Sequence, residues 1–370
     1  MNSYKEEILK DIPHFNNWKT ITPINKGFSN DLKFKVELKE ELQQQQQMKF
    51  QLLRISESKL FKEKDIEFST IKIFNSVLLN DDDEKLEVEM SKPIDIGLCN
   101  EEKNVWMLLT WIEGEDFNDS IFNESIENQY RLGLNAGKIL KRFHLIPLSS
   151  LINNNNDTTT PPPPPPPPPI INTDRLEKRL EVISRFEKDI NGKFRFENDQ
   201  CIIDYCKLNL EKVVKINENL QNSKLVLKHN DFHFGNMILI KNNNDNNDNN
   251  DNNDNDTSKL GIIDFNRSQF GYGYQEFHKI QFFNVGLSIP FCVGQIDGYF
   301  NNKEPPSDFW YSFTTFVATS CLGGIVWAES IDDNQIELMK ERCKIILNHF
   351  DNFNLIIPKW YTNFKNNNNN

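Results

Sequence analysis

The spacing of apolar positions predicts a small β-rich lobe at the start of the chain. Apolar and polar residues alternate from Trp18 to Pro23, as they do in a strand with one buried face. A polar turn and further apolar runs follow, so that five strands are expected, at 18–23, 32–36, 48–55, 94–97 and 105–111. Residues 59–78 instead place Ile66, Ile71 and Phe74 on one face, which predicts a helix.

The rest of the chain has mainly helical periodicity. Helices are expected at 129–145, 173–190, 199–220, 275–283, 309–329 and 334–349. A short polar connector at 112–115 separates this part from the strands. We therefore predict an α+β protein of two lobes: an antiparallel sheet with one helix over 1–111, and a larger helical lobe over 116–362.

Four low-complexity tracts interrupt the pattern, at about 41–47, 152–169, 242–258 and 363–370. Tracts of Gln, Asn, Asp and Pro bury too little apolar surface to offset the entropy lost on ordering, so solvated loops and a disordered tail are expected. The nine prolines at 161–169 favour polyproline II, which offers a weak site for an SH3 or WW partner. Removing the third tract would join Ile240 to Leu260 as a hairpin.

A polar loop between two apolar runs carries the candidate chemistry. His229, Asp231 and Asn236 have the H-x-D-x-x-x-x-N spacing of a kinase catalytic loop, and an apolar run ending at Ile263 delivers Asp264. Phosphoryl transfer uses such a set, because an Asp meets the acceptor hydroxyl while an Asn and a second Asp bind Mg²⁺. A hairpin with a structural histidine is the alternative, but the matched Asn and Asp favour a kinase.

Composition excludes several other classes of protein. The formal net charge is −12, and no basic stripe is present, which argues against binding to nucleic acid. An acidic surface suits cationic substrates, although solubility explains it equally well. No run of about 18 apolar residues is evident to span a membrane, and the charged N-terminus lacks a signal core. A cytoplasmic protein is expected.

With these features in place, the sequence resembles the aminoglycoside phosphotransferase family of the protein-kinase-like fold, which includes choline- and ethanolamine-kinase-like relatives. The segment 229–236, His-Asn-Asp-Phe-His-Phe-Gly-Asn, is similar to the family's His-Gly-Asp-Leu-His-x-Gly-Asn. The segment 262–265 resembles its metal-binding Asp segment, and 105–115 resembles its adenine-contacting strand and hinge. Asn230 stands where most relatives have Gly, and Glu276 where they have a later Asp.

The resemblance implies ATP and Mg²⁺ as cofactors and a small-molecule hydroxyl as acceptor. Asp231 would orient the hydroxyl and take its proton, and His233 would contact the γ-phosphate or brace the loop. Asn236 and Asp264 would hold Mg²⁺. The nucleotide would be bound by an Arg54–Glu67 pair (with Glu63 in reserve), by Ser29 and Asn30 in the turn, and by Thr110, Trp111 and Ile112 at the hinge.

Two alternatives stay open at this point. A choline- or ethanolamine-type kinase is favoured by the sequence His229-Asn230-Asp231, but not by the segment 264–299, which looks closer to uncharacterised bacterial members. A catalytically silent nucleotide-binding or adaptor module would have no need of Asp231, Asn236 and Asp264 together.

Overall fold

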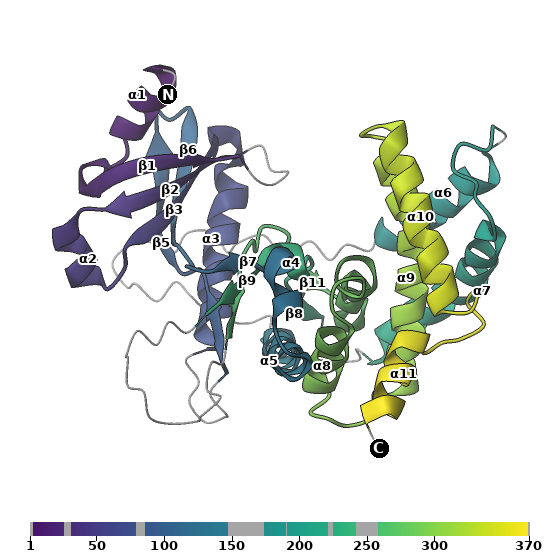
Figure 1. The fold of residues 1–370 in the computed structure, drawn as a ribbon. Helices are drawn as coiled ribbons and strands as arrows, with labels where there is room; N and C mark the ends of the chain where they lie inside the picture. The colour runs from purple at the N-terminus through teal and green to yellow at the C-terminus, as the bar shows by residue number, and fades with distance from the viewer. Residues whose placement is uncertain are drawn as a thin grey trace, which may run out of the picture.

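The computed structural model describes residues 3–25, 31–78, 86–146, 174–189, 191–220, 225–241 and 258–368. These residues form a small lobe built on a sheet and a larger lobe made mainly of helices (Figure 1). The predicted α+β, two-lobed, protein-kinase-like architecture is confirmed. Most of the tracts at 152–169 and 242–258 lie outside the described residues, as does all of the polyproline segment.

An antiparallel sheet of five strands, in the order β1-β2-β3-β6-β5, forms the small lobe. The strands are β1 (Trp18–Ile24), β2 (Leu32–Leu38), β3 (Phe50–Glu57), β5 (Pro93–Cys99) and β6 (Asn104–Thr110). Each predicted strand is present, with ends that differ from the prediction by at most two residues. In this register Arg54 lies on a central strand, opposite Lys33 and Met107.

Helix α3 (Phe61–Ser76) connects the small lobe to the core of the large one. Its Phe74 is fully buried, and the Phe74 ring lies 4.4 Å from that of Phe143 and 5.1 Å from that of Phe265. Because Phe265 follows Asp264 directly, this contact fixes the helix that carries Glu67 relative to the segment that carries Asp264.

The prediction of a single helix in the small lobe is wrong. Helix α1 (Ser3–Lys10) buries Ile8 and Leu9 against the sheet, and helix α2 (Glu40–Gln46) occupies the glutamine tract predicted as a loop. Gln43 of α2 donates a hydrogen bond from Nε2 to the Leu38 carbonyl at 2.6 Å. Glutamine is a good helix former, so the tract can extend a helix that is anchored at one end.

A second sheet, β4-β10-β9-β7, carries the candidate catalytic segment. Its strands are β4 (Val88–Met90), β7 (Glu115–Asp116), β9 (Met237–Ile240) and β10 (Lys259–Ile262), and β8 (Val226–Lys228) pairs with β11 (Gln269–Gly271) nearby. Lys259 faces Ile240 in the antiparallel register, as the predicted hairpin requires. The predicted tract end at 258 is wrong by one residue, because Ser258 is buried and accepts a hydrogen bond from Arg131.

The large lobe contains most of the helices. They are α4 (Phe117–Ser120), α5 (Ile126–Leu145), α6 (Asp174–Glu187), α7 (Asp199–Leu220), α8 (Ile289–Tyr299), α9 (Ser307–Ala328), α10 (Asp333–His349) and α11 (Lys359–Asn368). The helix expected at 275–283 is instead a 3₁₀ turn, Gly273–Phe277, followed by a π-helical segment, Ile280–Asn284. The predicted disordered tail from residue 363 is helical as far as Asn368.

Helices α5 and α8 pack unusually closely, and four glycines make this possible. A Cβ atom at Gly133 or Gly137 would overlap the backbone of α8, and one at Gly294 or Gly298 would overlap the backbone of α5. The α8 helix was not predicted, because its glycines and its apolar residues blur the helical period. The two helices lie side by side (Figure 1), and both contribute side chains to the main hydrophobic core.

Helix α9 is one segment whose length and hydropathy would allow it to span a membrane, contrary to the expectation from the sequence. It is long and apolar enough, with a mean hydropathy of 1.3 over its most apolar window, but 72% of that window is buried inside the protein. Phe309, Phe313 and Val317 are fully buried among other helices of the large lobe. The apolar character of α9 is that of a core helix.

Candidate active site

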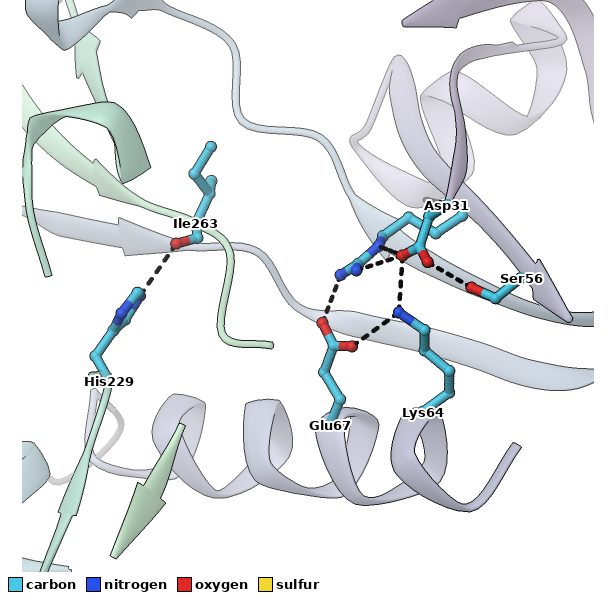
Figure 2. Close-up of polar contacts among 7 residues, drawn as sticks. Asp31, Ser56, Lys64, Glu67, His229 and Ile263 are labelled. Carbon is cyan, nitrogen blue, oxygen red and sulfur yellow. Dashed lines mark hydrogen bonds and ion pairs between the residues drawn. The ribbon is translucent and has the colours of Figure 1, made fainter. Parts of the chain in front are cut away.

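A buried cluster of charges joins the sheet of the small lobe to α3 (Figure 2). Arg54 of β3 contacts Glu67 of α3, as predicted, and its other guanidinium edge donates to Asp31 at 2.5 and 2.9 Å. Lys64 lies 2.7 Å from Asp31 and 3.3 Å from Glu67. Glu63, the reserve partner for Arg54, is absent from these contacts among the described residues.

The cluster is electrically balanced and nearly dry. The side chains of Arg54, Asp31 and Glu67 are 5–6% exposed. Burial by itself would raise the pKa of Asp31, but Arg54, Lys64 and the Ser56 hydroxyl lower it to about 2. Burial likewise opposes the charge on Arg54, yet Glu67, Asp31 and Asp264 together raise its pKa well above its ordinary value. Asp31 and Arg54 are therefore both ionised at neutral pH.

The catalytic loop is anchored by His229. Its Nε2 lies 3.1 Å from the carbonyl of Ile263, the residue before Asp264, so one bond joins the two segments expected to surround the phosphates (Figure 2). The ring also packs between Phe232 and Phe265. Burial lowers the pKa of His229, so the ring is neutral at neutral pH and carries its proton on Nε2, from which it donates to this carbonyl. His229 is thus a positioning residue for the loop.

The backbone conformation of residue 230 explains how Asn can replace the glycine that is usual at this position. Its φ is 64°, in the left-handed region that glycine adopts freely and that asparagine tolerates best among other residues. Its N–H donates to Glu276, whose other oxygen lies 3.0 Å from Nε2 of the buried His144. The Asn230 side chain also accepts from Lys228 at 3.2 Å. The Glu276 carboxylate therefore stabilises the catalytic loop by accepting a hydrogen bond from the loop backbone at Asn230.

Asp231 lies in a strongly cationic environment. Nζ of Lys279 is 2.8 Å from its Oδ1, Nε2 of His233 is 3.4 Å from the same atom, and Arg267 lies 3.8 Å from Oδ2. Burial alone would raise the pKa of Asp231, but the contacts with His233 and Lys279 hold it well below its ordinary range. The carboxylate is ionised and can accept a hydrogen bond from a hydroxyl. Lys279 was not predicted, because nothing in its local sequence marks it.

His233 has the contacts of a bracing residue. Its ring stacks on Phe283 at 4.2 Å, and its Nδ1 accepts a hydrogen bond from the Gly235 N–H at 3.1 Å. The Gly235 bond requires the neutral Nδ1, so a proton on this ring resides on Nε2, which faces Asp231. Of the two predicted roles, these contacts match bracing of the loop.

Asn236 and Asp264 offer the oxygen ligands that Mg²⁺ prefers. The Asn236 amide nitrogen donates to the Asp231 carbonyl at 2.9 Å and to its carboxylate at 3.3 Å, which leaves Oδ1 without a partner among the described residues. Asp264 has a φ of 64°, an uncommon and strained conformation for a residue with a side chain. Two such ligands fit Mg²⁺, which takes its remaining ligands from phosphates and water.

The predicted hinge residues lie between the two sheets. The N–H groups of Thr110 and Trp111 already donate to the carbonyls of Lys92 and Phe50, at 2.8 and 3.3 Å. Among the described residues no backbone hydrogen bond of Ile112 is found, which makes it the hinge residue best able to bind a ligand. Its side chain lies close to Gly261 of β10.

Two predicted phosphate contacts, Ser29 and Asn30, lie outside the described residues. The residue that follows them, Asp31, was missed as a site residue, as was Lys64. The signal available for Lys64 was its position one helical turn before Glu67, on the same face of α3. Asp31 had no comparable signal, because it reaches the cluster through the pairing of β2 with β3.

Comparisons with known proteins assign the chain to a family. The model of the phosphotransferase enzyme family (APH) matches residues 20–309, and the chain therefore belongs to that family. It is an enzyme of the phosphotransferase class, as predicted. A comparison with curated proteins gave no match to this sequence.

Solved structures show the same fold at low sequence identity. The GDP and kanamycin complex of APH(2")-IIia has a TM-score of 0.59 at 12% identity, over 92% of this chain and 98% of that one. The GDP complex of the aminoglycoside 2'-phosphotransferase-IIIa F108L mutant has a TM-score of 0.60 at 14% identity, over 95% and 98%. The ternary complex of APH(4)-Ia with AMP-PNP and hygromycin B has a TM-score of 0.52 at 12% identity, over 94% and 98%.

Proposed function

We propose that the protein is an ATP- and Mg²⁺-dependent kinase that transfers the γ-phosphoryl group to a hydroxyl of a small molecule. The observation that carries this proposal is the joint placement of Asp231, Asn236 and Asp264 by two contacts, the Asn236–Asp231 bonds and the His229–Ile263 bond. A silent nucleotide-binding module would not need an ionised aspartate beside two metal-binding side chains. The nucleotides in the related solved structures support a nucleotide site in the same fold.

In the proposed mechanism the chain supplies position and charge. The adenine base binds between the sheets, against the hinge at Ile112. Arg54 and Lys64, both held by Asp31 and Glu67, would face the phosphates from the small lobe. Asn236 and Asp264 would hold Mg²⁺, which neutralises developing charge on the phosphoryl group. Because the transition state for this transfer is loose, these placements contribute more than the basicity of any one group.

Asp231 and Lys279 would act on the two reacting groups. Asp231 accepts the hydrogen bond of the acceptor hydroxyl, holds its oxygen in line with the γ-phosphate, and takes the proton as the bond to phosphorus forms. Lys279, 2.8 Å from Asp231, lies where its ammonium group can also approach the transferred phosphoryl group. The low pKa of Asp231 makes it a weak base, which a loose transition state tolerates.

The test is a comparison of Asp264→Asn with wild type. Calorimetry should give a wild-type affinity for ATP that rises when Mg²⁺ is added, and this rise should be largely lost in the variant. ADP release with an acceptor from a broad panel should fall by about two orders of magnitude or more, because charge stabilisation of this kind carries much of the rate.

Asp333→Asn is the matched control, since its side chain is 90% exposed on α10 and it removes the same charge. The control should bind and turn over as wild type does. If Asp264→Asn kept its Mg²⁺-dependent affinity and near-normal turnover, the proposed metal site would be wrong.

A further inference from the structure

A cavity of about 370 Å³ opens beside the candidate catalytic aspartate. Asn230, the neighbour of Asp231 in sequence, lines it, and so do Arg267 and Lys279, which both contact the Asp231 carboxylate. The opposite wall comes from α6 and α9. An acceptor whose hydroxyl meets Asp231 would place the rest of its structure in this cavity.

The cavity wall carries mainly positive charge. Its lining includes Lys178, Arg179, Arg267 and Lys279, and among the described residues it includes neither Asp nor Glu. The wall and Asp231 together carry four positive side chains and one negative side chain, an excess of three positive charges. His278, also in the wall, adds no charge, because burial and the nearby Lys279 hold its pKa well below its ordinary value.

The cationic side chains come from separate elements that converge on one space. Lys178 and Arg179 lie on α6, Lys279 follows the 3₁₀ turn, and Arg267 lies between β10 and β11, three residues after Asp264. The Arg179 guanidinium donates to Thr319 of α9 and lies 4.7 Å over the Phe316 ring, so it is held at the wall. Lys178 makes no ion pair among the described residues. The cavity wall is therefore positively charged, although the whole chain has a net charge of −12.

Helix α9 contributes small side chains to the same wall. Thr319 and Ser320 line the cavity one helical turn before Gly323 and Gly324. A Cβ atom at Gly323 would have no described heavy-atom neighbour within 4 Å. Packing therefore does not require this glycine, and its absent side chain leaves room inside the cavity.

We infer that the acceptor is an anionic hydroxyl compound, a small molecule that carries a carboxylate or a phosphate besides the hydroxyl that is phosphorylated. Its anionic group is bound by Lys178, Arg179 and Arg267, while its hydroxyl meets Asp231. Arginine and lysine bind carboxylate and phosphate through charge-assisted hydrogen bonds. A polycationic aminoglycoside or a quaternary ammonium alcohol would instead bring its charge against this wall, which disfavours it. The inference rests on the proposed kinase function and adds the substrate class to it.

The first experiment compares matched acceptors with the full chain, ATP and Mg²⁺. Glycerol is compared with glycerate and glycerol 3-phosphate, and glucose with gluconate and glucose 6-phosphate, beside choline, ethanolamine and kanamycin. We expect kcat/KM to be at least about tenfold higher for an anionic member than for its neutral analogue, and to fall as salt rises. Equal rates for neutral and anionic members, or activity with cationic acceptors alone, would overturn the inference but leave the kinase function standing.

The second experiment changes the wall. Lys178→Glu should raise KM for the best anionic acceptor about tenfold or more, because it places a like charge against the substrate, with little change in kcat. Gly323→Leu should also raise the acceptor KM, with an unchanged melting temperature and an unchanged KM for ATP. Lys344→Glu is the control, because Lys344 is an exposed cation on α10 outside the cavity. Equal KM values for Lys178→Glu and this control would contradict the assignment.

A binding measurement covers the case in which no acceptor of the panel is turned over. Inorganic phosphate is titrated by calorimetry into the protein saturated with AMP-PNP and Mg²⁺, so that the nucleotide site is filled. Wild type and Lys344→Glu should bind it, and Lys178→Glu should bind it several-fold more weakly. Absence of binding to wild type would overturn the inference, whereas failure of AMP-PNP itself to bind would contradict the proposed function instead.

Discussion

Replacing Asp31 by Asn should destabilise the small lobe, because it breaks the balance of the buried charge cluster. The variant leaves Arg54 and Lys64 with one carboxylate, Glu67, in a site where the side chains are at most 10% exposed. The fold lowers the pKa of Asp31 from its ordinary 3.8 to about 2. At about 1.4 kcal/mol per pKa unit, the ionised carboxylate contributes about 2–3 kcal/mol. Breaking a buried ion pair typically costs about 3–5 kcal/mol, which is of similar size.

The pH dependence follows from the direction of this pKa change. The pKa of Asp31 is lower in the folded than in the unfolded state, so its stabilising effect is complete above pH 3.8 and is lost as the pH falls towards about 2. The free-energy difference between wild type and Asp31→Asn should therefore be the same at pH 7 and at pH 5. It should shrink only below about pH 4.

Urea unfolding followed by tryptophan fluorescence and far-UV circular dichroism measures this difference. Glu113→Gln is the control, since Glu113 is 62% exposed and pairs with Lys35 at 3.2 Å. An exposed pair of this kind is worth at most about 1 kcal/mol. If Asp31→Asn cost no more than the control, or if its effect grew between pH 7 and pH 5, the account of the cluster would be refuted.

Two further predictions concern the catalytic hairpin. Replacing 242–257 by Asn-Gly should leave the melting temperature within a few degrees of wild type, because Ile240 and Lys259 already pair and Ser258 is kept; a replacement that extends to Ser258 should melt lower. Asn230→Gly should fold with near-normal stability, whereas Asn230→Val should lose about 1–2 kcal/mol or more, because a β-branched residue is strained at a φ of 64°. Equal unfolding free energies for these two variants would contradict the conformational explanation.

The sequence was sufficient to predict those features that depend on the spacing of residues within one segment. The helix predicted at 199–220 begins and ends at those residues. Helical spacing also limited the partner of Arg54 to Glu67 or, one turn earlier on the same face, Glu63, and the structure shows that it is Glu67. The candidate site residues Asp231 and Asn236 could likewise be singled out, because the kinase catalytic-loop pattern places them at a fixed separation along one segment, and the structure brings their side chains into contact.

The sequence was insufficient to predict those features that are determined by contacts between distant segments. The helix expected at 275–283 is instead a 3₁₀ turn, in which Glu276 reaches Asn230, and a π-helical segment, preceded by Lys279, which reaches Asp231. Such contacts join residues about 50 positions apart, and no local period encodes them. The cationic cavity was missed for the same reason, since Lys178 and Arg179 lie almost 90 residues before Arg267 and Lys279 in an acidic chain.

The central claim, that Asp231 performs phosphoryl transfer, is tested most directly by Asp231→Asn. The change is nearly isosteric and leaves Asn236 and Asp264 in place, so calorimetry should give an unchanged affinity for ATP and Mg²⁺ and thermal unfolding should show an intact fold. ADP release with the best acceptor should fall by about two orders of magnitude or more, because the amide can neither take the proton nor hold the hydroxyl as strongly. Unchanged turnover in an active preparation would remove Asp231 from the chemistry, and a loss of ATP affinity with an intact fold would make it a metal ligand instead.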